Sequence, residues 1–246
     1  MRLRLGAAVL VAAILPLTAV TIQQPASAGV DTTPPAVGSC HDLTLREGYR
    51  ASDPDPAVAC SARHTSHTFK VVEFEDPPPW RDEKVLQKIV RRQCVPAVRG
   101  ALGGNAKAVQ LSATSAPWWF MPTPAQRDAG AAWIRCDLVN LGGDRLMPLP
   151  ADPTLSLPLS DSRAKCRVGK RAHYLVTTCS RPHQYRATHA VKYPSARYPG
   201  DRRLQRWSVR KCGDKLGRSF GYYEWPGRLD WKLGFSYSIC FKTTRR

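Results

Sequence analysis

The sequence predicts an α+β protein made of two tandem, small, disulfide-stapled domains, each a largely antiparallel sheet with one helix. Three observations lead to this prediction. The eight cysteines of the 246-residue chain divide four and four between its halves, short patterns around them recur, and strand-like and helix-like segments follow the same order in each half. The composition, with 43% hydrophobic, 9% aromatic and 23% charged residues, argues against a long disordered or fibrous protein.

The patterns around the cysteines repeat at matching intervals. Segments 60–64 and 179–183 both read Cys-Ser-x-x-His, and the next cysteine follows 34 residues after Cys60 and 33 residues after Cys179. Two later sets share spacings of eight, three and three: Pro122, Gly130, Trp133 and Cys136, and Pro226, Gly234, Tyr237 and Cys240. We interpret these agreements as a tandem duplication.

The first 28 residues have the features of an export signal. Arg2 and Arg4 precede an apolar run, and Ala26-Ser27-Ala28 has the small-x-small pattern of a cleavage site. The run is too short for a retained membrane anchor, which needs about 20 apolar residues. No later run is long enough to span a bilayer, so we expect a secreted mature chain without a transmembrane anchor, with an N-terminal tail over 29–37.

Export implies that the cysteines are oxidised. We expect neighbours in the sequence to pair: Cys40 with Cys60, Cys94 with Cys136, Cys166 with Cys179, and Cys212 with Cys240. Four cysteines allow three connectivities, and the sequence does not choose between them. Domains of this size have small cores, so cross-links of about 3 kcal/mol each would contribute substantially to stability.

The expected elements follow from hydrophobic periodicity. In the first half, strands are expected at 39–45, 57–61, 67–74, 107–113 and 131–139, a turn region at 117–124, and a helix at 82–102 that Pro96 interrupts. In the second half, strands are expected at 165–168, 174–179, 188–193, 219–225 and 235–242, and a helix at 201–216. The first domain is placed at 38–146, a proline-rich linker at 147–161 and the second domain at 162–246.

Net charge divides along the same line. Residues 29–155 hold 14 basic and 14 acidic side chains, whereas residues 156–246 hold 21 basic and 5 acidic ones. A surplus of 16 positive charges repels itself, which favours a polyanion-binding role for the second half over a merely solvated surface. The candidate binding residues lie on the first strand and turn and on the helix of this half: Arg163, Lys165, Arg167, Lys170, Arg171, Arg202, Arg203, Arg206, Arg210, Lys211 and Lys215.

Patterns that could indicate catalysis are weak, and no catalytic residue, metal ligand or cofactor is predicted. Residues 217–221 read Gly-x-Ser-x-Gly, but a helix precedes Ser219 and a strand follows it, which reverses the order that serine hydrolases need. His64 and His183 are interpreted as turn residues that bond the backbone, with metal or acid–base roles as the alternative. The aromatic clusters 118–120 and 222–225 are expected to fill the core, with stacking on sugars or bases as the alternative.

Several of these segments resemble a known family. The Gly38-Ser39-Cys40 opening, residues 58–64, the Cys94 helix and residues 122–136 are similar to the septum-formation-related domain of secreted and membrane-anchored actinobacterial proteins. The similarity covers 38–137, with a diverged second copy over 165–241. It implies a cell-envelope protein with a part in septum formation during cell division.

Two hypotheses about function follow. The preferred one is a noncatalytic, extracytoplasmic, wall-associated protein whose second half binds an anionic wall polymer or an anionic membrane surface, with division-site proteins as further partners. The alternative is a secreted hydrolase of wall glycan or nucleic acid that uses His64 or His183 as its acid–base group.

Overall fold

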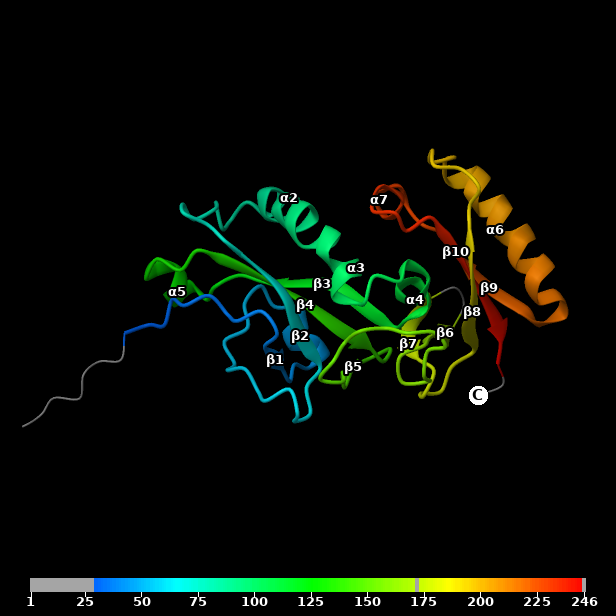
Figure 1. The fold of residues 1–246 in the computed structure, drawn as a ribbon. Helices are drawn as coiled ribbons and strands as arrows, with labels where there is room; N and C mark the ends of the chain where they lie inside the picture. The colour runs from blue at the N-terminus through cyan, green and yellow to red at the C-terminus, as the bar shows by residue number, and fades with distance from the viewer. Residues whose placement is uncertain (1–28, 171–172, 245–246) are drawn as a thin grey trace, which may run out of the picture.

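The computed structural model describes residues 29–170 and 173–244, and the export segment predicted over 1–28 lies outside them. Two antiparallel five-stranded sheets lie one after the other along the length of the molecule (Figure 1). The α+β class and the division into two disulfide-bearing halves are confirmed.

The first half carries its sheet beneath one long helix. Its strands are β1 (Cys40–His41), β2 (Ser66–Glu73), β3 (Thr114–Phe120), β4 (Trp133–Leu141) and β5 (Leu146–Met147). Their order is β1-β2-β4-β3, and β5 pairs with β4. The long helix is α2 (Glu83–Gln93), and the shorter helical segments are α1 (Leu45–Gly48), η1 (Val95–Ala97), α3 (Val98–Ala101), α4 (Ala106–Leu111) and α5 (Pro124–Asp128).

The second half has the same plan. Its strands are β6 (Lys165–Lys170), β7 (His173–Thr178), β8 (Tyr185–Lys192), β9 (Phe220–Glu224) and β10 (Tyr237–Thr243), in the order β7-β6-β8-β10-β9. The long helix is α6 (Asp201–Leu216), followed by η2 (Gly217–Ser219) and later by α7 (Arg228–Lys232). Strands β6, β8, β10 and β9 therefore take the places of β1, β2, β4 and β3.

All four expected disulfides are present and lie at matching places in the two halves. Cys40–Cys60 and Cys166–Cys179 each begin in the strand β1 or β6, and Cys94–Cys136 and Cys212–Cys240 tie the long helices α2 and α6 to strands β4 and β10. The register also agrees. Phe69 and Thr188, each nine residues after the matching cysteine, are the extra residues of β-bulges opposite β4 and β10. β-Bulges are designed features of a sheet and not defects, so their equivalent positions support the same strand arrangement in the two halves.

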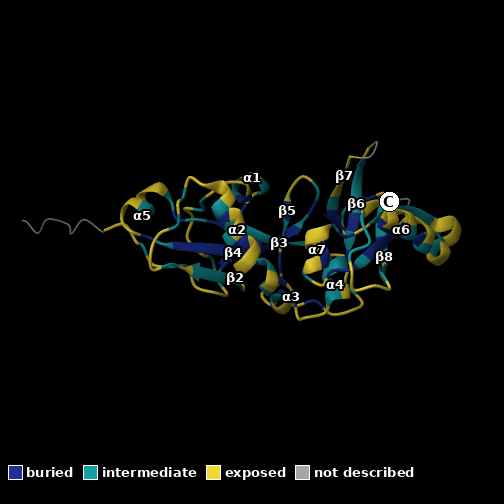
Figure 2. Cartoon of the chain, turned by 90° about the horizontal axis from the view of Figure 1, so that it is seen from above, coloured by how far each residue is buried: buried dark blue, intermediate teal, exposed yellow. Residues whose placement is uncertain are grey.

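Each long helix packs one face onto its sheet. In α2 the inward residues are Leu86 and Val90, with Cys94 at its end, and in α6 they are Leu204, Ser208 and Cys212. Spacings of four keep such residues on one side of a helix. Figure 2 shows β4 buried through the first half, whereas α6 presents exposed residues at the far end of the molecule.

The two halves are joined by a packed interface. Leu111 of α4 lies in one apolar cluster with Ile239 and Phe241 of β10. In the segment predicted as a linker, Leu155 is buried in a first-half cluster, and Leu159 contacts clusters of both halves. The segment over 147–161 therefore contributes apolar side chains to the cores.

Two element predictions in the first half were wrong. The strand expected at 107–113 is helix α4, because Asn105 caps the amides of Lys107 and Ala108, and the buried Ala108 and Leu111 lie at a helical spacing of three. Part of the turn region expected at 117–124 is strand β3. Pro117 fits there because β3 pairs only with β4 and the pairing is irregular next to it.

The two expected N-terminal strands were mostly wrong. Only Cys40 and His41 of 39–45 form a strand, because Thr44 and Glu47 form a capping box that starts helix α1. In 57–61, Val58 alone bridges to Cys40 and a turn follows. The expected break at Pro96 is confirmed, since the 3₁₀ turn η1 separates α2 from α3.

Candidate functional site

The basic surface predicted for the second half centres on helix α6. Leu204, Ser208 and Cys212 face the sheet, so the basic side chains fall on the remaining sides of the helix. Arg202, Arg203, Arg206, Arg210 and Lys215 are exposed and Lys211 is half-buried. We call these six residues the basic face of α6.

Few acidic groups compensate this face. Lys211 pairs with Asp214 at 3.6 Å, and the Asp201 carboxylate accepts a hydrogen bond from the Tyr198 hydroxyl. Within the described residues, no ion pair is formed by Arg202, Arg203, Arg206 or Arg210. Like charges four residues apart on a helix repel each other by about 0.2–0.5 kcal/mol per pair. The Arg202, Arg206 and Arg210 row therefore carries a cost that an anionic ligand would relieve.

The position of two arginines adds to this cost. Arg202 and Arg203 lie in the first turn of α6. The amino end of a helix carries a partial positive charge, so cations there are unfavourable and anions favourable. An anion bound at this end would interact with both the helix dipole and the guanidinium groups.

The remaining candidate cations lie in different surroundings. Arg167 Nε donates to Glu224 Oε1 at 2.6 Å, and Lys165 Nζ lies 3.5 Å from Glu224 Oε2. The Arg163 guanidinium is buried and donates to the Pro153 carbonyl at 2.7 Å; burial lowers its pKa, and the nearby Asp152 charge partly offsets that effect. Lys170 is exposed at the end of β6, and Arg171 lies outside the described residues. The structure thus separates the strand cations from the basic face of α6.

Helix α2 carries a matching basic row that was not predicted from the sequence. When the helices are aligned on Cys94 and Cys212, Lys84, Lys88 and Arg92 fall on the positions of Arg202, Arg206 and Arg210. All three α2 residues are exposed. Aligning the two helices on their cysteines would have predicted this row. The charge count for each half did not, because acidic residues elsewhere in the first half balance these cations.

The histidines of the repeated pattern are structural. His64 and His183 are 1% and 2% exposed, and each donates from Nδ1 to the carbonyl two residues earlier, at 2.9 Å to Ala62 and 2.7 Å to Arg181. This agrees with the interpretation of both as turn residues.

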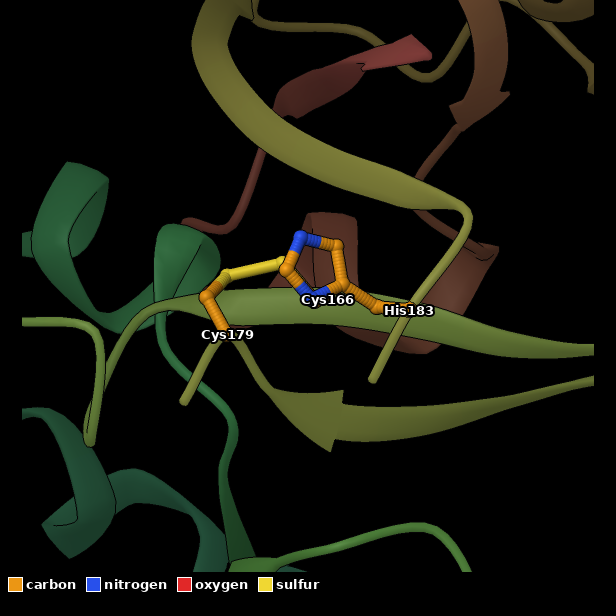
Figure 3. Close-up of side chains that lie close together, drawn as sticks. All are labelled: Cys166, Cys179 and His183. Carbon is orange, nitrogen blue, oxygen red and sulfur yellow. A yellow bond between two sulfur atoms is a disulfide. The ribbon is translucent and has the colours of Figure 1, made fainter. Parts of the chain in front are cut away.

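One cluster in the described residues brings together three side chains of metal-binding type, namely Cys166, Cys179 and His183. Figure 3 shows the His183 ring beside the Cys166–Cys179 disulfide. Because both sulfur atoms are bonded to each other, neither is available as a thiolate, which is the form that binds metals. The cluster therefore offers one imidazole and no thiolate ligand.

The Gly-x-Ser-x-Gly segment lies in an unsuitable place for a nucleophile. Ser219 follows helix α6 and precedes strand β9, and its hydroxyl donates to the Leu216 carbonyl at 2.7 Å. It borders a surface cleft with His183, but the described residues contain no hydrogen bond between the two side chains. This arrangement lacks the nucleophile–base contact that serine hydrolases need.

A buried charged cluster in the first half was not foreseen. The Arg135 guanidinium lies 2.8 Å from Asp53 Oδ2 and 3.0 Å from Asp137 Oδ2, and His41 Nδ1 lies 3.2 Å from Asp53. Burial raises the pKa of Asp53, but the hydrogen bonds from His41 and Arg135 and the Arg135 charge hold the pKa below its ordinary value of 3.8. A surface cleft of about 550 Å³ is bordered by three of these residues, His41, Asp53 and Arg135.

Hydrogen bonds around this cluster fix the direction of the Ser39 hydroxyl. Asp137 is acceptor-only when ionised, so Thr68 donates to it at 2.9 Å and accepts from Ser39 at 3.1 Å. The Ser39 hydrogen therefore points away from His41 Nε2, which lies 3.3 Å from its oxygen. The side chains lie next to one another in the order of a catalytic triad, Ser39, His41 and Asp53. A nucleophilic serine must donate its hydrogen to the histidine, whereas Ser39 donates to Thr68 instead.

The fold and these sites define an extracytoplasmic type of α+β protein with two sheets, four disulfides and one strongly cationic helix. No helix among the described residues is long and apolar enough to cross a membrane.

The chain belongs to the septum formation family, whose profile matches residues 37–225. This single match runs through both sheets and ends before α7 and β10. Membership connects the protein with septum formation, a step of cell division. Comparisons with curated proteins and with solved structures found no match.

Proposed function

We propose that this protein acts outside the cytoplasm in septum formation as a noncatalytic, wall-associated factor that holds an anionic cell-wall polymer on the basic face of α6. We further propose that residues 38–146 and 162–246 are diverged copies of one unit. The common strand order, bulge positions and disulfides support the duplication.

The observation that carries the binding proposal is the unpaired row of Arg202, Arg206 and Arg210. Successive members are four residues apart, which is about 6 Å along a helix. All three are exposed, and the described residues provide no carboxylate within ion-pair distance of them. A row of guanidinium groups suits the repeated phosphate or carboxylate groups of a linear polymer, since each can donate two parallel hydrogen bonds.

Salt dependence tests the electrostatic basis of the proposal. Retention of the mature protein on purified cell walls should fall by at least about tenfold between roughly 50 and 200 mM salt, because counterions compete for the same groups. Walls stripped of their anionic polymer should retain little protein. Unchanged retention across this range of salt would contradict the proposal.

The two long helices allow a matched comparison. Replacing Arg202, Arg206 and Arg210 with Glu changes six units of charge, as does the same replacement of Lys84, Lys88 and Arg92 at the corresponding positions of α2. We expect the α6 variant to lose at least about tenfold in wall binding and the α2 variant to lose much less, because acids elsewhere balance the first half. Equal losses would show that net charge matters and the α6 row does not.

A separate binding experiment distinguishes a wall polymer from a membrane surface as the anionic partner. Vesicles containing phosphatidylglycerol present an anionic membrane surface without any wall polymer. Stronger α6-dependent binding to these vesicles than to walls would overturn the wall-polymer proposal in favour of the membrane.

A further inference from the structure

A second surface, in the first half, has the composition of a ligand-binding groove. Its cavity of about 500 Å³ lies between the segment after α1, the segment before α2 and strand β3. The large apolar lining residues include Tyr49, Trp80, Pro117, Trp118, Trp119 and Met121. Pockets for small ligands are typically about 300–1,000 Å³ and are lined mainly by aromatic and apolar side chains with a few polar groups. We call this surface the aromatic groove.

The groove walls are held by the fold. The Met121 amide donates to the Ala51 carbonyl at 2.9 Å, which fixes the segment after α1 against the end of β3. Gly48 lies so close to the Trp118 ring that a Cβ atom there would overlap it. The backbone at the end of α1 therefore supports the indole directly, and the groove is formed before any ligand binds.

One aromatic side chain of the groove faces solvent without an evident structural need. Tyr49 is 75% exposed, and its ring centroid lies 5.0 Å from that of Trp118 at an interplanar angle of 40°. Trp118 and Trp119 each pack one side against a core cluster. The cluster 118–120, which was predicted as core, thus serves the core and also lines the groove.

Charge at the groove narrows the class of ligand. Arg50 and Arg81 provide guanidinium donors, and Glu83 provides carboxylate acceptors. Groups of both signs at the rim, in a half with 14 basic and 14 acidic residues, give no preference for a polyanion or a polycation. The fitting ligand is uncharged, has flat apolar faces for the aromatic rings and carries hydroxyl groups for the rim. Pyranose sugars combine these properties.

We propose that the aromatic groove binds a segment of uncharged glycan, with sugar rings stacked on Tyr49 and Trp118 and hydroxyl groups bonded to Arg50, Arg81 or Glu83. This site is separate from the basic face of α6, and the inference does not depend on the proposed polymer binding. It gives the two halves different ligands, one recognised by stacking and the other by charge.

The test uses the full mature chain and uncharged oligosaccharides. Chitotetraose and cellotetraose are titrated while tryptophan fluorescence is recorded, and calorimetry checks the result. We expect saturable binding of at least one of them, with an affinity that changes less than twofold between 50 and 500 mM salt. Insensitivity to salt separates this site from the polymer-binding face, so either proposal can fail alone.

Variants locate the binding. Tyr49→Ala should weaken binding at least fivefold while preserving the fold, because the side chain is largely in solvent. Gly48→Ala should also weaken it by displacing the Trp118 ring. Trp225→Ala is the matched control, since Trp225 is an exposed aromatic residue of the second half. Circular dichroism and a thiol count confirm that each variant is folded and oxidised.

Three results would overturn the inference. The first is the absence of binding to both oligosaccharides at millimolar concentration. The second is binding that Tyr49→Ala leaves unchanged. The third is saturable, Tyr49-dependent binding of a proline-rich peptide without binding of either sugar, which would assign the groove to a protein partner.

Discussion

On the face of each sheet that points away from its long helix, the two halves place different side chains at the same register positions. Cys136 and Cys240 occupy equivalent places, opposite Trp119 and Tyr223. The residue before each cysteine is Arg135 in β4 and Ile239 in β10, and the residue after is Asp137 or Phe241. One face is therefore charged and hydrogen-bonded, whereas the other is apolar.

The segment that covers each face explains the difference. The first disulfide spans 20 residues in the first half and 13 in the second. The longer segment brings Asp53 over β4, where it pairs with Arg135. The shorter one forms the β6–β7 hairpin instead, and Leu111 of α4 covers Ile239 and Phe241. The same strand arrangement is thus compatible with a charged or an apolar covering segment, provided that the strand residues beneath it are charged or apolar in turn.

The largest expected effect comes from breaking the charged face. Arg135→Leu leaves the buried Asp53 and Asp137 carboxylates without their cation, so we expect a loss of about 3–5 kcal/mol in the free energy of unfolding. Arg163→Leu is the control, because Arg163 is also buried but donates to Pro153 and Thr114 and forms no ion pair in the described residues. Its loss should be smaller, about 1–3 kcal/mol. Urea unfolding at pH 7 measures both, and equal losses would mean that ion pairing does not distinguish the halves.

The next effect tests whether the helix–strand disulfides have equal importance. Removing Cys94–Cys136 or Cys212–Cys240 by paired Ala substitutions should cost about 3–4 kcal/mol each in the chain-entropy model. The two cysteines are 42 residues apart in the first half and 28 in the second, so the costs should differ by less than about 1 kcal/mol. Unfolding in guanidinium under oxidising conditions measures both. A variant that loses almost nothing would show that the two cross-links are not equivalent.

A smaller effect concerns the face of each sheet that the long helix covers. On this face one pair of helix and strand residues is apolar in the first half and polar in the second. Val90 of α2 and Ile134 of β4 pack together in the first half, and Ser208 and Ser238 replace them in the second, with their oxygens 2.6 Å apart. Ser208→Ala should cost about 1–3 kcal/mol, because the buried Ser238 hydroxyl loses its partner. Adding Ser238→Ala should cost less than the sum of the two single losses. Strict additivity in urea unfolding would contradict this coupling.

The sequence predicted the plan of the fold through features that act locally. Repeated cysteine spacings indicated the matching order of elements in the two halves and the disulfide pairs, and the helix expected at 201–216 has the bounds of α6. The errors lie where tertiary contacts override a local pattern. Residues 107–113 alternate like a strand, but burying Ala108 and Leu111 together requires a helix.

The candidate sites were only partly predictable. Charge counts identified the second half, yet they could not separate the free arginines of α6 from Arg167, whose partner Glu224 is 57 residues away. The buried cluster had no sequence signal, since Arg135 is 82 residues away from its partner Asp53. The aromatic groove likewise depends on Tyr49 meeting Trp118 across the fold. Contacts of this kind follow from packing, which the linear pattern does not contain.

The smallest effect is the response of the charged face to acid. Burial raises the pKa of Asp53, but the hydrogen bonds from His41 and Arg135 and the Arg135 charge outweigh that effect, so the pKa is lowered in the folded protein. A carboxyl group with a depressed folded pKa contributes stability above its unfolded pKa, near 3.8, and loses it as the pH falls through the lower folded value. Asp53→Asn should therefore be less stable than the natural protein at pH 7, and the gap should narrow below about pH 4. Urea unfolding of both proteins between pH 2 and 7 measures this gap. A gap that stays constant would show that Asp53 stabilises the first half through packing and not through its charge.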